Sequence, residues 1–210
     1  QEILAMVARL RAQLLAKARV YSTDDVVHIR MEYARDPGQP RLVRKSFETP
    51  SSPAQVKVVE QTVQNWFPKV ESRLAVARPL GYLIPGDKAA VVETLLRHKI
   101  AVDLFTQDGP VSVEAYEVKS VEPADFDWLP PKAIEVEKKA MTVIARKGDF
   151  YVSCAQPAAN LIPCLLEPQS QFGFICFQKL KLVPKAEEVF SITRYVEEKP
   201  LPLVPYKRFL

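Results

Sequence analysis

The stretch that says most about the fold is residues 148–170, GDFYVSCAQPAANLIPCLLEPQS. Its opening run, 150–154, predicts a short strand that follows a Lys-Gly-Asp turn. Proline suits the first position of a helix, so Gln156-Pro157 predicts a helix start. Because Pro163 follows soon after, this segment is either a short helix or two turns, and the Glu-Pro pair beyond it predicts a stop. The stretch therefore predicts one strand followed by a short helix or by two turns.

Patterns on both sides of this stretch add further elements. Apolar residues at 3 and 4 spacing predict an amphipathic helix that contains Ile3, Val7, Leu10 and Leu14. Gly86-Asp87 can cap a second helix, whose apolar residues are Val91, Val92, Leu95 and Leu96. Further strands are predicted over 26–33, 42–47, 78–85, 100–105, 111–121, 134–145, 172–177 and 189–196. Residues 54–68 fit a strand and a helix equally well.

These elements predict an α+β fold with mixed or antiparallel sheets, an N-terminal amphipathic helix and short packed helices. We expect three parts. Residues 1–76 hold the helix and a connecting β-hairpin region, residues 77–196 form an α+β accessory domain, and residues 197–210 form an extended, proline-rich tail. Because the sequence opens in a helical pattern without Met or a signal peptide, we expect further sequence upstream of Gln1.

The composition, 48% hydrophobic and 26% charged, is that of a folded protein. The net charge of +4 is spread without a basic stripe, so we expect no nucleic-acid partner. No run of eighteen apolar residues occurs, so we expect no membrane partner either. Without a Cys-x-x-Cys pair there is no zinc ribbon. We expect Cys164 and Cys176 in the core and Cys154 partly exposed, with one disulfide plus one free thiol as the alternative.

A search for catalytic and metal-binding groups finds no catalytic residue and no metal ligand. His28 and His98 are the two histidines, and His28 stands four residues before Glu32, which is the wrong spacing for a shared metal ion. His98 is explained by its place at a helix end. Carboxylate pairs occur at 187–188, at 197–198 and at Asp125 with Asp127, and such groups are usually solvated. We predict no cofactor in this chain.

One cluster of residues suggests binding. Phe126 and Trp128, followed by Pro130-Pro131, are the candidate binding residues, as an exposed aromatic platform for a peptide or a glycan. The other interpretation, which the apolar area favours, is a loop whose aromatic side chains pack into the core, because folding tends to bury the large apolar areas of aromatic rings. The prolines of the tail fit a strap on the domain surface or a polyproline ligand.

Five motifs carry a resemblance to a known family. They are Arg-Pro-Leu-Gly-Tyr-Leu-Ile-Pro at 78–85, Val-Glu-Ala-Tyr at 113–116, Gln-Pro at 156–157, Leu-Glu-Pro at 166–168, and the strand over 190–195. In this order the chain resembles the C-terminal accessory region that follows the catalytic domain of bacterial zinc carboxypeptidase-like proteins, a metallopeptidase family of hydrolases. The resemblance covers roughly residues 78–196.

The resemblance implies that this chain is a non-catalytic α+β module of a zinc carboxypeptidase-like protein. It implies a partner, the upstream peptidase domain of the same protein, which the module supports or whose substrate access it limits. Zinc is expected only in that upstream domain, because no position here matches the family's His-x-x-Glu motif. The family also implies a periplasmic or secreted location, on which the residues themselves are silent. The alternative function is a stand-alone glycan- or peptide-binding module centred on Phe126 and Trp128.

Overall fold

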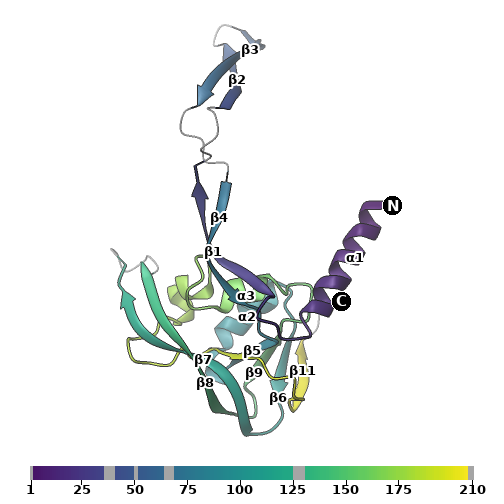
Figure 1. The fold of residues 1–210 in the computed structure, drawn as a ribbon, viewed down its shortest axis with the longest axis vertical. Coiled ribbons are helices and arrows are strands. Elements are labelled where there is room, and N and C mark those ends of the chain that lie inside the picture. Colours follow the sequence, from purple (N-terminus) through teal and green to yellow (C-terminus); the bar gives the residue numbers. More distant parts are fainter. Residues whose placement is uncertain (1, 36–40, 50–51, 64–68, 125–130, 208–210) are drawn as a thin grey trace. The chain divides into compact units, whose positions relative to one another are not determined.

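A computed structural model describes residues 2–35, 41–49, 52–63, 69–124 and 131–207. The chain divides into two compact units (Figure 1). We call residues 1–30 and 74–210 the sheet unit and residues 31–73 the ribbon unit. The predicted α+β class is confirmed, with mainly antiparallel sheets and an N-terminal helix.

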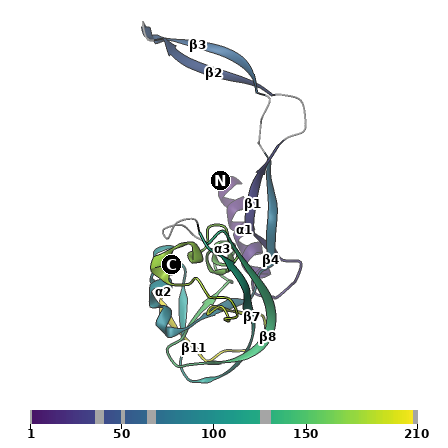
Figure 2. The same ribbon diagram turned by 90° about the vertical axis from the view of Figure 1, so that its left-hand side faces the viewer.

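A seven-stranded sheet organises the sheet unit, in the order β11-β6-β9-β5-β10-β7-β8, and every neighbouring pair runs antiparallel. The strands are β5 (Gly81–Ile84), β6 (Val102–Phe105), β7 (Gly109–Glu122), β8 (Ala133–Ala145), β9 (Phe150–Ser153), β10 (Thr193–Tyr195) and β11 (Leu203–Lys207). The long strands β7 and β8 lie side by side as a curved ribbon (Figure 2). The short central strands β5 and β9 are almost fully buried.

Three α-helices accompany the sheet in the described residues: α1 (Glu2–Lys17), α2 (Ala89–Arg97) and α3 (Leu161–Leu166). Short 3-10 helices are η1 (Gly86–Lys88), η2 (Phe174–Cys176) and η3 (Gln178–Leu180). Alternation along β5 separates two apolar clusters, because successive strand residues point to opposite faces. Tyr82 and Ile84 join α2 and α3 in the larger cluster, while Leu83 joins Tyr151 in the smaller one.

The ribbon unit consists of paired strands. β2 (Arg41–Thr49) and β3 (Ser52–Val63) pair antiparallel, from Arg41 opposite Val63 to Thr49 opposite Ser52 (Figure 2). β1 (Val26–Ala34) and β4 (Lys69–Ala77) form a second two-stranded sheet, and the division of the chain into units falls within both strands. Where the exposure of ribbon-unit side chains is described, none is buried.

Several local predictions were wrong. The expected strand over 172–177 instead contains the 3-10 turn η2, which is closed by the bond from Cys176 N–H to Gly173 O, and η3 follows directly after it. The helix expected from Pro157 begins at Leu161, after turns over 157–160. Pro163 is tolerated in the first turn of α3, because the backbone N–H groups there need no intrahelical partner.

Three further expectations need correction. Asp87 makes no cap, since residue 88 precedes α2 and no side-chain capping bond forms. The strand expected over 189–196 is reduced to β10, with one isolated bridge between Val189 and Glu117. The cysteines are reversed in burial: Cys154 is fully buried, Cys164 and Cys176 are half-buried, and all three thiols are free. None of the described helices is long and apolar enough to span a membrane.

Candidate functional site

The residues that were considered from the sequence as metal-binding, catalytic or ligand-binding candidates lie in different parts of the chain. His28 is an exposed residue of β1, and its carbonyl oxygen accepts a bond from the Cys164 thiol at 3.8 Å. His98 ends α2, where its backbone N–H bonds to Thr94 O and Leu95 O. Within the described ranges, no group of three or more His, Cys, Asp or Glu side chains is placed to hold a metal ion. Phe126 and Trp128 lie outside the described residues, as do Asp125 and Asp127.

The other carboxylate pairs are on the surface. Glu187 and Glu188 are exposed in the turn before β10. Glu197 lies 2.8 Å from the Lys199 ammonium, whose hydrogen bond lowers the pKa of that carboxyl. A carboxylate with a lowered pKa is a poor general acid or base near neutral pH. None of these groups has the apolar setting that proton-transfer chemistry usually needs.

A buried charge network, which the sequence analysis missed, lies in the core of the sheet unit. Arg194 of β10 is 1% exposed, with Nε 3.3 Å from Glu167 Oε1 and Nη1 3.4 Å from Glu114 Oε2. Nη1 donates to the Tyr116 hydroxyl at 3.0 Å, and Nη2 donates to the carbonyl of Ala77. The Tyr82 hydroxyl donates to Glu167 Oε1 at 2.6 Å. The only sequence signal was a single Arg within an apolar strand.

Burial and the neighbouring charges determine the protonation states of the side chains in this network. Burial raises the pKa of Tyr82 and Tyr116, and the nearby Glu167 carboxylate raises both further, so both phenols stay neutral. Burial by itself lowers the pKa of Arg194, but Glu167, the two tyrosines and Glu114 raise it overall. The guanidinium therefore stays charged. These groups hold strands together and are closed to a substrate, so we regard them as structural.

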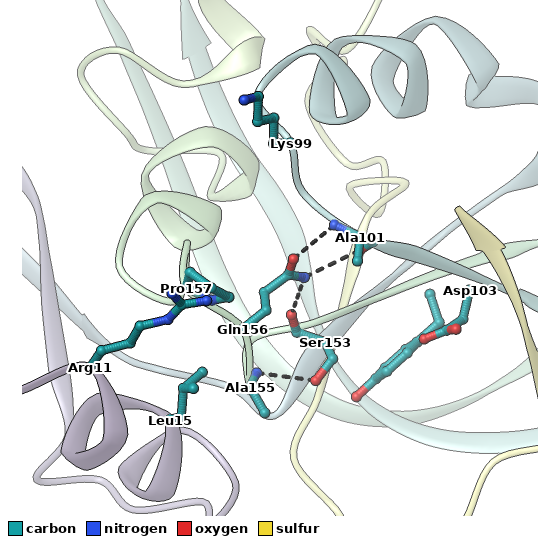
Figure 3. A pocket seen from close by; sticks show the side chains of 10 residues that line it. Arg11, Leu15, Lys99, Ala101, Asp103, Ser153, Ala155, Gln156 and Pro157 are labelled. Atoms are coloured by element: carbon teal, nitrogen blue, oxygen red, sulfur yellow. Dashed lines mark hydrogen bonds between the residues drawn. The ribbon is translucent and has the colours of Figure 1, made fainter. Parts of the chain in front are cut away.

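A first pocket, of about 680 Å³, opens beside β6 and β9 (Figure 3). The two strands pair at Asp103 with Tyr151 and then separate. Gln156 bridges the gap: its Oε1 accepts from Ala101 N–H at 2.7 Å, and its Nε2 donates to Ala101 O at 3.2 Å and Ser153 O at 2.7 Å. Gln156 therefore replaces a missing backbone pair, which explains the Gln before Pro157.

The side chains that line this first pocket carry charges of both signs. Arg11 of α1 and Lys99 bring positive charge, whereas Asp103 is a nearly buried carboxylate (Figure 3). Tyr151 lies against Gly81, where a Cβ atom would stand 2.4 Å from the phenol ring. Burial raises the pKa of the Tyr151 hydroxyl, so it stays protonated. Opposed charges of this kind do not select one ligand class.

A second pocket, of about 710 Å³, is lined largely by aromatic and aliphatic side chains, and we call it the aromatic groove. It lies between the end of α2, α3 and the η2–η3 segment. Its lining residues are Thr94, His98, Leu165, Phe172, Phe174, Cys176, Phe177, Gln178, Lys179 and Leu180. Phe172 is 77% exposed and Phe177 is 57% exposed. These two rings present apolar area to solvent beside a preformed hollow.

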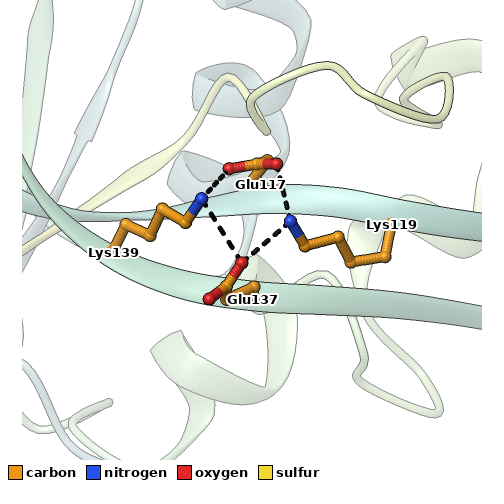
Figure 4. A network of polar contacts seen from close by, with 4 residues as sticks. All are labelled: Glu117, Lys119, Glu137 and Lys139. Atoms are coloured by element: carbon orange, nitrogen blue, oxygen red, sulfur yellow. Dashed lines mark hydrogen bonds and ion pairs between the residues drawn. The ribbon is translucent and has the colours of Figure 1, made fainter.

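Two further features lie on the surface of the sheet unit. Glu117 and Lys119 of β7 and Glu137 and Lys139 of β8 form a ring of four ion pairs on the β7–β8 ribbon (Figure 4). On α1, five large apolar residues are exposed and none of the helix's residues is buried. These are Ile3, Leu4, Met6, Val7 and Leu10.

Comparison of this chain with models of protein families, with curated proteins and with solved structures found no match.

Proposed function

We propose that this chain is a non-catalytic accessory module of a zinc carboxypeptidase-like protein, which packs on the peptidase domain of the same protein through α1. The observation that carries the proposal is the exposed apolar face of α1. The motifs at 78–85, 113–116, 156–157 and 166–168 supply the proposed family. The catalytic zinc belongs, in this proposal, to the peptidase domain and not to this chain.

The two ends of α1 differ in a way that favours docking. Near its C-terminal end, Leu14 and Leu15 are half-buried, and the Lys17 ammonium lies 3.0 Å from the Asp25 carboxylate. The apolar residues of the N-terminal part, from Ile3 to Leu10, remain exposed. A helix of this length gains little stability in water without a packed face. A partner surface that covers these side chains gives α1 that stability.

The proposed partner contact is tested by binding. We expect the 210-residue chain to bind the separately purified peptidase domain of its own protein in calorimetry. Replacing Ile3 and Val7 together by Asp should weaken binding at least about tenfold, since both lie on the apolar face. The matched control replaces Ala5 and Ala12 by Asp on the opposite face, by the 100° rotation per residue of an α-helix. The control should bind like the wild type.

Two outcomes would overturn the proposal. If the Ile3→Asp, Val7→Asp variant binds as tightly as the wild type, α1 is not the docking face. If the chain alone holds one zinc ion per molecule and releases C-terminal residues from peptides, it is not a non-catalytic module. Metal analysis and a peptide-release assay on the purified chain measure both properties directly.

A further inference from the structure

Close packing and a hydrogen bond fix the backbone around the aromatic groove. The exposed rings of Phe172 and Phe177 form its two rims. Ser170 Oγ donates to Cys164 O at 2.5 Å, which ties the segment before η2 to α3. A Cβ at Gly173 would stand 2.9 Å from the Ser170 side chain, so the backbone here is packed closely. Phe174 between the two rims is buried. The groove is therefore preformed, which lowers the entropy cost of binding a ligand.

The exposure of Phe172 and Phe177 is unusual within this segment. Neighbouring apolar residues, Phe174 and Ile175, are almost fully buried, while these two rings stay in water on either side of them. Clustered exposed aromatic area beside a hollow is typical of a binding surface. Large rigid rings also supply much contact area at a small loss of side-chain entropy. The groove thus suits a bulky apolar side chain of a ligand.

The charge at the groove is positive. Of its ten lining residues, Lys179 carries a positive charge and none carries a carboxylate. A ligand that complements the groove therefore carries negative charge next to its apolar anchor. Gln178 adds an amide that can donate to and accept from a peptide backbone.

We propose that the aromatic groove binds an acidic peptide segment of a protein partner, with a bulky apolar side chain of the peptide held between Phe172 and Phe177 and its carboxylates near Lys179. This site is separate from the α1 face, because none of its lining residues belongs to α1. It does not depend on the proposed accessory role.

The direct test is a binding titration of the full chain with a fluorescein-labelled peptide that has one Trp flanked by Asp and Glu. We expect a rise in fluorescence anisotropy with the acidic Trp peptide. A peptide with Ser in place of the Trp, and one with Lys in place of every Asp and Glu, should both bind at least about tenfold more weakly, because each lacks one half of the complementary chemistry.

A second readout locates the peptide. Cys176 lines the groove and is half-buried, whereas Cys154 is fully buried. In a Cys164→Ser variant, a small thiol reagent should therefore modify Cys176 selectively. We expect the acidic Trp peptide to slow that modification. The peptide with Ser in place of Trp should leave the rate unchanged.

Matched variants test whether the two rims of the groove, Phe172 and Phe177, bind the peptide. Phe172→Ala and Phe177→Ala should each weaken binding about tenfold without unfolding the chain, because both rings are exposed. Ile144→Ala, at a site 60% exposed on β8, is the control for loss of an exposed apolar residue. Lys179→Glu should weaken binding, while Lys147→Glu in the β8–β9 turn should not.

The proposal is overturned if the acidic Trp peptide does not bind, or if the basic analogue binds equally well. It is also overturned if the Phe172→Ala and Phe177→Ala variants keep wild-type affinity. If laurate protects Cys176 and the peptide does not, the groove is a site for a small anionic amphiphile, and the peptide proposal is wrong.

Discussion

Single residues in the core decide the electrostatics of the sheet unit. Arg194 carries a full positive charge at 1% exposure. The free energy of this buried charge depends on Glu167, whose side chain is equally buried. Removing one partner of a buried ion pair usually costs more than the pair itself contributes, because the other charge stays buried without compensation. This contact joins β10, which lies between β5 and β7, to the end of α3.

We predict that Glu167→Gln lowers the free energy of unfolding by about 3 kcal/mol, because it leaves the Arg194 guanidinium without its closest carboxylate. Urea denaturation followed by circular dichroism measures the change. Glu198→Gln, at an exposed site, is the control and should have no measurable effect. A loss below about 1 kcal/mol would mean that Glu114 and the Tyr116 hydroxyl suffice to balance the charge.

Gln156 gives a second prediction at this scale. Its amide makes three hydrogen bonds where β6 and β9 separate. Gln156→Ala should lower the free energy of unfolding by about 2 kcal/mol, since Ala101 N–H and two carbonyl groups lose their partners. The same urea experiment measures this, with the exposed Gln107→Ala as control. Unchanged stability would show that water in the pocket replaces the amide.

Among the elements, the β7–β8 ribbon carries a regular pattern of cross-strand ion pairs. β8 is an edge strand of the sheet, and an edge strand is a template for unwanted pairing. Lys138 and Lys139 lie on it, and Lys139 pairs with Glu117 and Glu137 (Figure 4). Lysines on an edge oppose the approach of a second strand. The ribbon therefore combines cross-strand attraction with protection against aggregation.

Acid should act on this ribbon through Glu117. Hydrogen bonds from Lys119 and Lys139 lower the pKa of its carboxyl from 4.5 to about 2. A lowered folded-state pKa gives stability that is present above pH 4.5 and is lost as the pH falls towards 2. We predict that wild type and Glu117→Gln differ in melting temperature at pH 7 and converge near pH 2.

The dependence on salt concentration distinguishes a stabilisation by the charge of Glu117 from a stabilisation by its packing. Because all four side chains are accessible to solvent, the difference between wild type and Glu117→Gln at pH 7 should shrink in about 1 M NaCl, where the Debye length is about 3 Å. Thermal melts at two salt concentrations measure it. A difference that is independent of both salt and pH would mean that Glu117 acts through packing and not through charge.

At the scale of the whole molecule, the two units differ in how they are stabilised. The sheet unit has two apolar clusters, whereas the ribbon unit has no buried side chain where exposure is described. An isolated two-stranded ribbon is at best marginally stable in water. The fold of the chain therefore depends on the sheet unit.

We predict that replacing residues 31–73 by a short Asn-Gly turn leaves a folded chain with cooperative thermal unfolding, because no residue of either apolar cluster is removed. Calorimetry and one-dimensional NMR measure this. A synthetic peptide of residues 31–73 should show little strand signal in circular dichroism. Loss of cooperative unfolding in the shortened chain would mean that the ribbon unit is needed for folding.

The sequence by itself determined the elements with strong periodicity. The expected strands over 111–121 and 134–145 correspond to β7 and β8, and the helix that contains Val91, Val92 and Leu95 corresponds to α2. Long alternation and helical spacing are local properties of the chain, so they can be seen without tertiary contacts. The α+β class followed from these elements.

The tertiary structure alone decided the aromatic groove and the buried charge network. Residues 172–177 have a strand-like composition, but the close packing of Gly173 against Ser170 and the burial of Phe174 favour 3-10 turns. Arg194 meets Glu167 and Glu114 only because β10 inserts between β5 and β7. Contacts between residues far apart in the chain depend on the completed sheet, and their energies outweigh local preference.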